Sequence, residues 1–257
     1  MPTALIVEDE IEANKLLAML VQLQGYQTDS AYDGAEALAK VRSGVPDVIF
    51  LDLMLPDLDG YDVCRSLKAS GTTSKIPVII VTARIAAKNR IESFRAGADD
   101  YVPKPYTPDQ IFQALDQSDS WKRQIAAPQV EGQAVLDGRD DGNTLRRLAQ
   151  LRNLLPARSG LELDAIEGIM STIEAIWTSV DKWAHHCRLE QVATLAYLLT
   201  DESLTLTVHD EGGWLDSSGH VAGEPISTLL AGVPFDEVIA DHPAHRLTLI
   251  KRFERWT

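Results

Sequence analysis

Residues 48–62 read VIFLDLMLPDLDGYD, and this stretch decides the fold of the first half of the chain. Four apolar residues end in Asp52, and three more aspartates follow within ten positions. Carboxylates held close together repel one another, so the arrangement is costly unless something offsets it. We therefore expect either a bound cation or a reaction that uses the charges.

Strand-like and helix-like segments alternate on both sides of this stretch. Five apolar runs read as strands, and each is followed by a helical pattern; the strands are TALIVED, YQTDSA, PDVIFLD, IPVIIVTA and DDYVPKP. Alternation with near-continuous apolar strands predicts a parallel sheet covered on both faces. We therefore expect an α/β fold with a doubly wound, five-stranded parallel sheet in residues 1–118.

Polar residues follow four of these strands. Because the carboxyl ends of parallel strands meet at one edge of the sheet, we expect five side chains to gather there: Glu8, Asp9, Asp52, Thr82 and Lys104. Three carboxylates suit Mg²⁺, which prefers oxygen ligands. An aspartate can also act as a nucleophile and form an aspartyl-phosphate. Lys104 and Thr82 would then supply a positive charge and a donor to the phosphoryl oxygens.

Plainer explanations exist for some of these acids. Taken alone, Glu8 and Asp9 are equally explained as residues of a helix N-terminus, which favours acidic side chains. Asp57 and Asp59 are interpreted as turn residues before Gly60 rather than as metal ligands.

The ordered motifs resemble those of the receiver domain of two-component response regulators. They are VED at 7–9, DLMLPDLDG at 52–60, VTA at 81–83 and GADDYVPKPY at 97–106. The resemblance covers residues 3 to about 118 and implies a flavodoxin-like fold. It also implies that Asp52 accepts the phosphoryl group.

The resemblance assigns roles to the other residues as well. Asp9, Asp52 and the main-chain carbonyl of Met54 would bind Mg²⁺, with Glu8 acting through water. In the catalytic group, Thr82 and Lys104 would join Asp52 and hold the phosphoryl oxygens.

Two further features are implied by the same resemblance. Tyr101 would be the switch aromatic, moving between outward and inward positions as Thr82 shifts. The bond between Lys104 and Pro105 would be cis.

The region 81–106 also resembles a subfamily that dimerises through its fourth and fifth helices. That subfamily carries arginines on its last helix, whereas TPDQIFQALDQS at 107–118 has none, so a homodimer through the receiver stays open. Asp99 and Asp100 are expected on the surface or in such an interface.

Composition limits the class of protein. The chain has 257 residues, is 45% hydrophobic and 24% charged, and carries a formal net charge of −14. Residues 1–118 hold 11 basic and 17 acidic residues, and residues 119–257 hold 13 basic and 21 acidic residues. Neither half has the basic balance of a DNA-binding module. With neither a signal peptide nor an apolar run of 18 residues, we expect a cytoplasmic protein that does not enter membranes.

The second half has a different rhythm. Residues 119–142 lack a steady period and are predicted to be a linker, with the alternative that the preceding helix runs on through Trp121 to Ile125. Residues 143–257 are predicted to be a smaller α+β output domain. Its expected elements are helices at 144–155 and 161–189, two strands joined by TDES, short helical pieces at 226–232 and 234–240, and a final helix at 243–256.

This output domain resembles in part the ATPase fold shared by histidine kinases and anti-sigma-factor kinases. The matching stretches are EAIWTSVDKW at 174–183, VHDEGGWLD at 208–216 and HRLTLIKRF at 245–253. The resemblance implies a vestigial nucleotide site at Thr178, Asp210 and Gly212, with Asp210 facing the adenine amine and 245–253 forming a helix.

Several positions depart from that pattern. Thr178 stands where the family has a Mg²⁺-binding asparagine, and Trp214 stands where it has a second glycine. Ala244 and Arg246 replace glycines before the last helix. Glycine is used where backbone approaches phosphate closely, so these departures argue against tight ATP binding.

The sequence thus predicts a response regulator of a two-component phosphorelay. A sensor histidine kinase would phosphorylate Asp52 in the presence of Mg²⁺, and the switch would pass to an output domain that binds another protein, such as an anti-anti-sigma factor of a partner-switching circuit. We expect no enzyme activity beyond autophosphorylation and autodephosphorylation of the receiver. Two alternatives stay open: an active ATP-dependent serine kinase of the anti-sigma type, and a DNA-binding transcription regulator.

Overall fold

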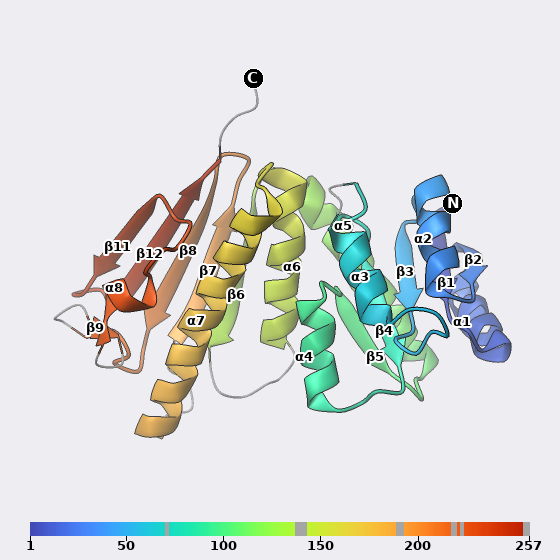
Figure 1. Cartoon of the computed structure of the whole chain (residues 1–257), viewed down its shortest axis with the longest axis horizontal. Coiled ribbons are helices and arrows are strands. Elements are labelled where there is room, and N and C mark those ends of the chain that lie inside the picture. The colour runs from blue at the N-terminus through green and yellow to red at the C-terminus, as the bar shows by residue number, and fades with distance from the viewer. Residues whose placement is uncertain (70–71, 137–142, 189–192, 217–219, 222–223, 254–257) are drawn as a thin grey trace. The chain divides into compact units, whose positions relative to one another are not determined.

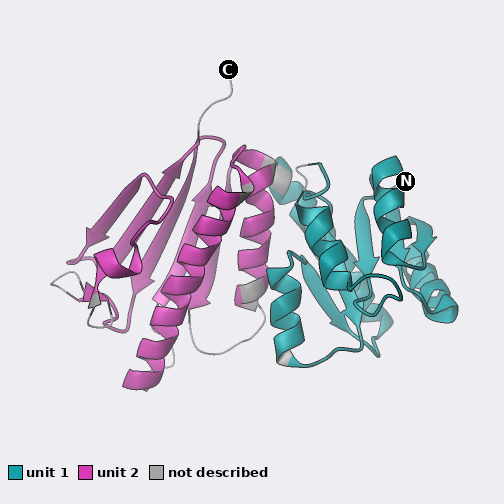
Figure 2. Ribbon diagram, viewed as in Figure 1, with its two compact units in different colours: residues 1–126 teal, residues 127–257 magenta. Residues whose placement is uncertain are grey.

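The computed structural model describes residues 1–69, 72–136, 143–188, 193–216, 220–221 and 224–253 (Figure 1). The chain divides into two compact units, Met1–Ala126 and Ala127–Thr257 (Figure 2). Within the described residues, no helix is long and apolar enough to cross a membrane.

The first unit is a parallel sheet with helices between its strands. The strands run in the order β2-β1-β3-β4-β5, and every neighbouring pair is parallel. The strands are β1 (Thr3–Val7), β2 (Gln27–Ala31), β3 (Val48–Leu51), β4 (Val78–Thr82) and β5 (Asp100–Pro103). The helices are α1 (Ile11–Leu23), α2 (Gly34–Ser43), α3 (Gly60–Lys68), α4 (Ala87–Arg95) and α5 (Pro108–Ala126). The predicted doubly wound α/β fold is confirmed.

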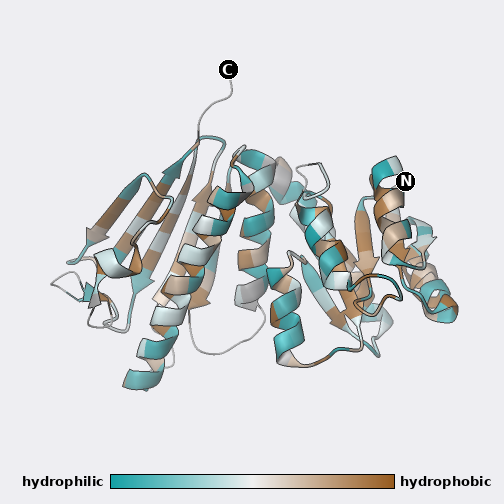
Figure 3. Ribbon diagram, in the orientation of Figure 1, coloured by the Kyte–Doolittle hydropathy of each residue, from teal (hydrophilic) through white to brown (hydrophobic). Residues whose placement is uncertain are grey.

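The central strands are apolar because both of their faces are covered. Every residue of β3 and β4 is buried, and these strands stand out as hydrophobic in Figure 3. Ile49 and Leu51 pack with Leu67 of α3 on one face of the sheet. Phe50 packs with Leu17 of α1 on the other face. Alternate residues of one strand therefore enter two separate cores, as expected of a parallel sheet between helices.

A buried ion pair holds α3 to the start of β5. The Lys68 ammonium donates to Asp99 Oδ2 at 2.6 Å and to the carbonyl oxygens of Ser74 and Ile76 at 3.1 and 2.7 Å. Asp99 and Asp100 are both buried, so the expectation that they lie on the surface or in an interface was wrong. Two adjacent acids in a sequence are normally expected to be exposed to solvent. The sequence gives no sign that Lys68 comes to lie beside Asp99 in the fold.

The loop after β3 is fixed to the N-terminus of α2. Asp57 Oδ1 and Oδ2 accept hydrogen bonds from the backbone amides of Gly34 and Ala35 at 2.8 and 2.9 Å. Asp33 caps the same helix through the amide of Glu36 at 2.6 Å. The first amides of a helix lack intrahelical partners and favour a negative charge. Asp57 is thus an anchor of the loop as well as a turn residue.

The second unit is an antiparallel sheet with helices on one face (Figure 1). The strand order of the large sheet is β11-β12-β8-β7-β6. The elements are β6 (Val130–Leu136), α6 (Asn143–Arg158), α7 (Leu163–Cys187), β7 (Ala193–Leu199), β8 (Ser203–Asp210), β9 (His220–Val221), β10 (Glu224–Pro225), α8 (Ile226–Leu229), β11 (Glu237–Asp241) and β12 (Arg246–Arg252). The predicted α+β class of this unit is confirmed.

The expected linker contains the end of a helix and a strand. Residues 119–126 continue α5, in agreement with the alternative that the helix runs on through Trp121 to Ile125, and Trp121 is buried. Residues 130–136 form β6, an edge strand of the second sheet, where a linker was predicted. Val130, Ala134 and Leu136 are buried with two-residue spacing, which is a strand pattern despite the charges around it. Residues 137–142 lie outside the described residues.

The end of the second unit also differs from the prediction. Residues 237–241 and 246–252 form strands where helices were expected. Leu247 and Leu249 are buried on either side of the half-exposed Thr248, so the true period is two. The same letters also fit helical spacing, and pairing of β12 with β8 decides between the two. The predicted helix at 245–253 was therefore wrong, and residues 254–256 lie outside the described residues.

Replacing Lys68 with methionine should destabilise the first unit strongly. The variant removes the cation beside the buried Asp99 carboxylate, which keeps its bond from the Val78 amide at 2.8 Å. Removing one partner of a buried ion pair typically costs about 3–5 kcal/mol. Urea unfolding at pH 7 measures this loss. The matched control is Lys15→Met, which removes a lysine whose exposed pair with Glu12 should contribute less than about 1 kcal/mol. Equal losses in the two variants would contradict the role given to the Lys68–Asp99 pair.

Replacing Asp57 with asparagine should lower stability in a pH-dependent way. Bonds from the Gly34 and Ala35 amides hold the pKa of Asp57 below its ordinary value of 3.8. A lowered pKa means that the carboxylate stabilises the fold above pH 3.8, and that this contribution disappears as the pH falls through the folded-state pKa. We expect the midpoint of thermal unfolding to fall by about 2–4 °C at pH 7.

The difference between Asp57→Asn and the natural chain should shrink as the pH falls below 3.8 and through the folded-state pKa of Asp57. The control is Asp62→Asn, whose carboxylate is exposed and pairs with Arg65. A loss in Asp57→Asn that stays constant from pH 7 to pH 3 would show that the charge is not what anchors the loop.

Candidate functional site

Three carboxylates meet at the carboxyl edge of the first sheet. Glu8 and Asp9 follow β1, and Asp52 follows the neighbouring strand β3, so the topology alone brings them together. One oxygen from each carboxylate lies within 4.8 Å of the others. Glu8 and Asp52 are buried, whereas Asp9 is exposed. The predicted acidic cluster is therefore present, with its open side at Asp9.

Lys104 is the cation of this cluster. Its ammonium donates to Asp52 Oδ2 at 2.6 Å and also to Glu8 Oε2. It follows β5, and the Lys104–Pro105 peptide bond is cis, as the sequence predicted. One lysine thus bonds to both carboxylates and offsets the repulsion between them.

Thr82 is the last residue of β4 and is fully buried. Its Oγ1 accepts a hydrogen bond from the amide of Arg84 at 3.4 Å. A hydroxyl that accepts in this way still has its own proton to donate elsewhere. The side chain is thus equipped to act as a donor at this edge.

Burial and pairing shift the pKa values of Glu8 and Lys104. Burial raises the pKa of Glu8 above its ordinary value, and repulsion from Asp52 and Asp9 acts in the same direction. The hydrogen bond and charge of Lys104 oppose that rise without cancelling it. Burial lowers the pKa of Lys104, but its bonds to Asp52 and Glu8 outweigh this effect and leave the pKa raised. Lys104 therefore stays charged at neutral pH.

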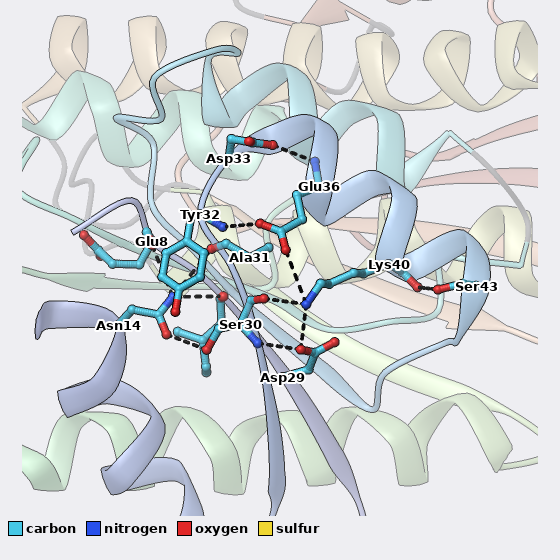
Figure 4. A network of polar contacts seen from close by, with 11 residues as sticks. Glu8, Asn14, Asp29, Ser30, Ala31, Tyr32, Asp33, Glu36, Lys40 and Ser43 are labelled. Atoms are coloured by element: carbon cyan, nitrogen blue, oxygen red, sulfur yellow. Dashed lines mark hydrogen bonds and ion pairs between the residues drawn. The ribbon is translucent and has the colours of Figure 1, made fainter. Parts of the chain in front are cut away.

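Asn14 on α1 supports Glu8 from behind (Figure 4). Its buried side-chain amide donates to the carbonyl oxygen of Glu8 at 3.2 Å, and its Oδ1 accepts from Ser30 Oγ at 2.6 Å. The amide of Glu8 donates to the carbonyl of Ala31 at 3.0 Å. The sequence analysis did not single out Asn14. Its signal was a polar residue on the face of α1 that otherwise buries apolar side chains.

The backbone after Asp52 is tightly constrained. The amide of Met54 donates to Asp52 Oδ1 at 3.1 Å, and Met54 pairs with Asp59 in an isolated bridge. A Cβ at Gly60 would lie 2.4 Å from the carbonyl oxygen of Asp52, which only glycine avoids. The first residue of α3 therefore sits directly against the backbone of Asp52.

Tyr101 is half-buried and packs against the core cluster that contains Leu51. Its hydroxyl donates to the carbonyl oxygen of Arg84 in the segment after β4. The ring therefore lies turned in toward that segment, one of the two positions expected for a switch aromatic.

The residues proposed as a nucleotide site in the second unit are occupied by local bonds. Asp210 Oδ1 accepts from the amides of Gly212 and Trp214, both at 3.0 Å, and Oδ2 accepts from that of Leu215 at 2.8 Å. The Trp214 indole is buried and donates to Ser179 Oγ at 3.0 Å. Asp210 thus closes its own turn.

Thr178 is exposed on α7 and lines a surface cavity of about 730 Å³ together with Glu174 and Lys182. Trp183, which also lines this cavity, donates its indole hydrogen to the carbonyl oxygen of Gly212 at 3.0 Å. Gly212 is thus linked to the cavity through Trp183, whereas Asp210 is bonded within its own turn.

The first cluster has a definite chemical capacity. Two buried carboxylates and one exposed carboxylate offer the hard oxygen donors that suit a divalent cation. Asp52 is a nucleophile candidate with a cation 2.6 Å away and a hydroxyl from the neighbouring strand.

The chain matches known proteins through this unit. The family profile described as response regulator receiver domain matches residues 4–116. Response regulator MprA of Mycobacterium tuberculosis is 39% identical over 108 residues, which are 42% of this chain and 46% of that protein. The MprA of Mycobacterium avium is 38% identical over the same share. The chain spans about half the length of the curated relatives it matches.

Two solved structures are similar to part of this chain. The receiver domain of a Francisella response regulator is 30% identical, with a TM-score of 0.43, and the match covers 47% of this chain and 98% of that one. The signal receiver domain of a signal transduction histidine kinase from Syntrophus aciditrophicus is 31% identical, with a TM-score of 0.45, covering 48% of this chain and 94% of that one. On the match of the family profile, residues 4–116 of this chain are a response regulator receiver domain.

Proposed function

We propose that this chain stores a phosphoryl group on Asp52 and passes the resulting switch to a protein-binding second unit. Receiver domains are phosphorylated by sensor histidine kinases, and such a kinase is the proposed donor. The observation that carries the proposal is the Lys104 ammonium 2.6 Å from Asp52 Oδ2, inside the cluster of Glu8, Asp9 and Asp52.

The reaction moves one phosphoryl group. An oxygen of Asp52 forms a bond to phosphorus while the phosphorus–nitrogen bond of the donor histidine breaks, and its electron pair stays on the imidazole. Glu8, Asp9, Asp52 and the Met54 carbonyl would hold Mg²⁺, which when bound would neutralise phosphoryl charge. Lys104 would move from Asp52 Oδ2 to a phosphoryl oxygen, and Thr82 would donate its free proton to another.

The acids at the start of β5 do not supply the charged dimer contacts of the resembling subfamily. Asp99 is buried and committed to Lys68, and Asp100 is buried and accepts from the amide of Tyr101. Neither carboxylate is free to pair with another copy. A homodimer through this face would need other contacts.

For the second unit we propose a protein-binding role without nucleotide. Asp210 has both carboxylate oxygens bonded within its own turn, and the Trp214 indole is buried against α7. The Asp210 side chain is 1% exposed, so an adenine amine could reach it only if the turn moved. Thr178 offers a shorter hydroxyl where the resembling ATPases use an amide oxygen to hold Mg²⁺.

The outer face of the second sheet supports the same role. Ala196, Thr207 and Thr248 lie in one cross-strand row at its centre, and none carries a charge. Leu198 and Ile239 are exposed on the same face. The rows on either side of this centre carry charges of both signs, among them Glu131, Glu237 and Arg246. A face with an uncharged centre, exposed apolar groups and mixed charges around it suits contact with a protein more than contact with DNA, which needs a basic surface.

Replacing Asp52 with asparagine should abolish phosphorylation. The full chain is incubated with acetyl phosphate and Mg²⁺, and phosphoprotein is measured by intact mass. The natural chain should gain one phosphoryl group, Asp52→Asn should gain none, and Asp62→Asn should behave as the natural chain because that carboxylate is exposed on α3. Phosphorylation of Asp52→Asn to the natural level would refute Asp52 as the acceptor.

ATP should not bind to the second unit. Calorimetric titration of the full chain with ATP and Mg²⁺ should give no saturable heat at concentrations up to about 1 mM, which corresponds to less than about 4 kcal/mol of binding free energy. The alternative of a serine kinase predicts micromolar binding that Asp210→Asn removes. Such a result would replace the protein-binding proposal with an ATP-dependent output.

A further inference from the structure

The segment between Thr82 and the start of α4 is held by two tyrosine hydroxyls from different elements. Tyr101 of β5 donates to the carbonyl oxygen of Arg84. Tyr61 of α3 donates to the carbonyl oxygen of Asn89, in the first turns of α4, at 3.1 Å. The Tyr61 side chain is buried, and that burial raises its pKa. The sequence analysis singled out Tyr101 and missed Tyr61.

Tyr61 is placed by the same backbone that carries the acceptor. It follows Gly60, whose Cα lies against the Asp52 carbonyl and whose amide donates to the carbonyl of Leu53 at 3.1 Å. The amide of Tyr61 donates to Asp59 Oδ1 at 3.0 Å. The Cα and Cβ of Tyr61 are therefore fixed relative to Asp52. The hydrogen bond from its hydroxyl to Asn89 thus fixes the distance between α4 and the proposed phosphorylation site.

Other contacts gather on the same segment. The Arg84 guanidinium lies 5.8 Å from the centroid of the Tyr61 ring and 3.4 Å from Asp59 Oδ2. The backbone amide of Arg84 donates to Thr82 Oγ1 at 3.4 Å. Tyr61 thus touches the residue whose amide orients the Thr82 hydroxyl.

The helix that follows has little else to hold its beginning. Its N-cap residue, Ala86, makes no side-chain capping bond. The buried Ser93 hydroxyl donates to the same Asn89 carbonyl at 2.8 Å from within α4, and its hydrogen bond with the Tyr61 hydroxyl opposes the rise in the pKa of Tyr61. The bond from Tyr61 differs because it crosses from α3 to α4.

We infer that Tyr61 is a positioning residue for the phosphoryl group. Its hydroxyl holds the 84–89 segment where the Arg84 amide occupies one lone pair of Thr82 Oγ1, so that the Thr82 proton is left to donate to a phosphoryl oxygen on Asp52. Tyr61 and Tyr101 bind the same segment, so each supports the other. The inference rests on the proposed function, because it concerns the phosphoryl group on Asp52.

The test uses the full chain and beryllofluoride, a phosphoryl mimic, with Mg²⁺. Affinity is measured by calorimetry at 25 °C for the natural chain, Tyr61→Phe, Ser66→Ala, Tyr101→Phe and the double variant Tyr61→Phe with Tyr101→Phe. Tyr61→Phe keeps the ring and loses only the hydroxyl. Ser66→Ala is the matched control, since it removes a hydroxyl of the same helix that donates only to a carbonyl oxygen within α3, that of Asp62 at 2.8 Å. Thermal unfolding of each variant confirms that it is folded at the temperature of the titration.

Tyr61→Phe should bind beryllofluoride about three- to tenfold more weakly, the effect of one hydrogen bond. Ser66→Ala should stay within about twofold of the natural chain, and the effect of Tyr61→Phe should shrink in a Tyr101→Phe background because the two hydroxyls share one segment. Natural affinity in Tyr61→Phe, or equal losses in Tyr61→Phe and Ser66→Ala, would overturn the inference. A natural chain that binds no beryllofluoride would instead overturn the proposed function.

Discussion

The ion pair between Lys104 and Asp52 is the interaction on which the receiver edge depends. The sheet buries the Asp52 and Glu8 carboxylates beside each other, and one ammonium bonds to both. A buried charge left without its partner typically costs about 3–5 kcal/mol. The pair therefore stabilises the resting site, and it is also the bond that a phosphoryl group would have to take over. Lys104 would therefore serve both the stability of the resting site and the proposed phosphorylation.

The loops around this pair are held by hydrogen bonds to other helices and strands rather than by bonds within each loop. Asp57 ties the β3–α3 loop to α2, Asn14 holds the backbone of Glu8, and the hydroxyls of Tyr61 and Tyr101 hold the segment after β4. Each anchor joins two elements that are distant in the chain. A small movement at Asp52 is therefore resisted by identified bonds, and a switch at this site has to break or keep particular ones.

In the second unit, the buried Asp210 carboxylate satisfies backbone amides of its own turn, and the buried Trp214 indole bonds to Ser179 of α7. A buried acceptor is stable only when it is bonded, so the turn supplies its own donors. These bonds hold the end of β8 and the following turn against α7.

The sequence by itself determined the α/β order of the first unit and the five residues at its edge, from Glu8 to Lys104. It could do so because strand alternation forces the carboxyl ends of parallel strands together, whatever the side chains between them. Elements with ambiguous period were not determined in this way: residues 246–252 fit a helix equally well until β8 pairs with them.

Only the tertiary structure decided the roles of Asn14, Tyr61, Lys68 and Asp57. Their partners lie on other helices, strands or loops. The identity of such a partner cannot be read from the residues next to them in the sequence. The same reason explains Asp99, which looks exposed in the sequence and is buried because Lys68 neutralises it.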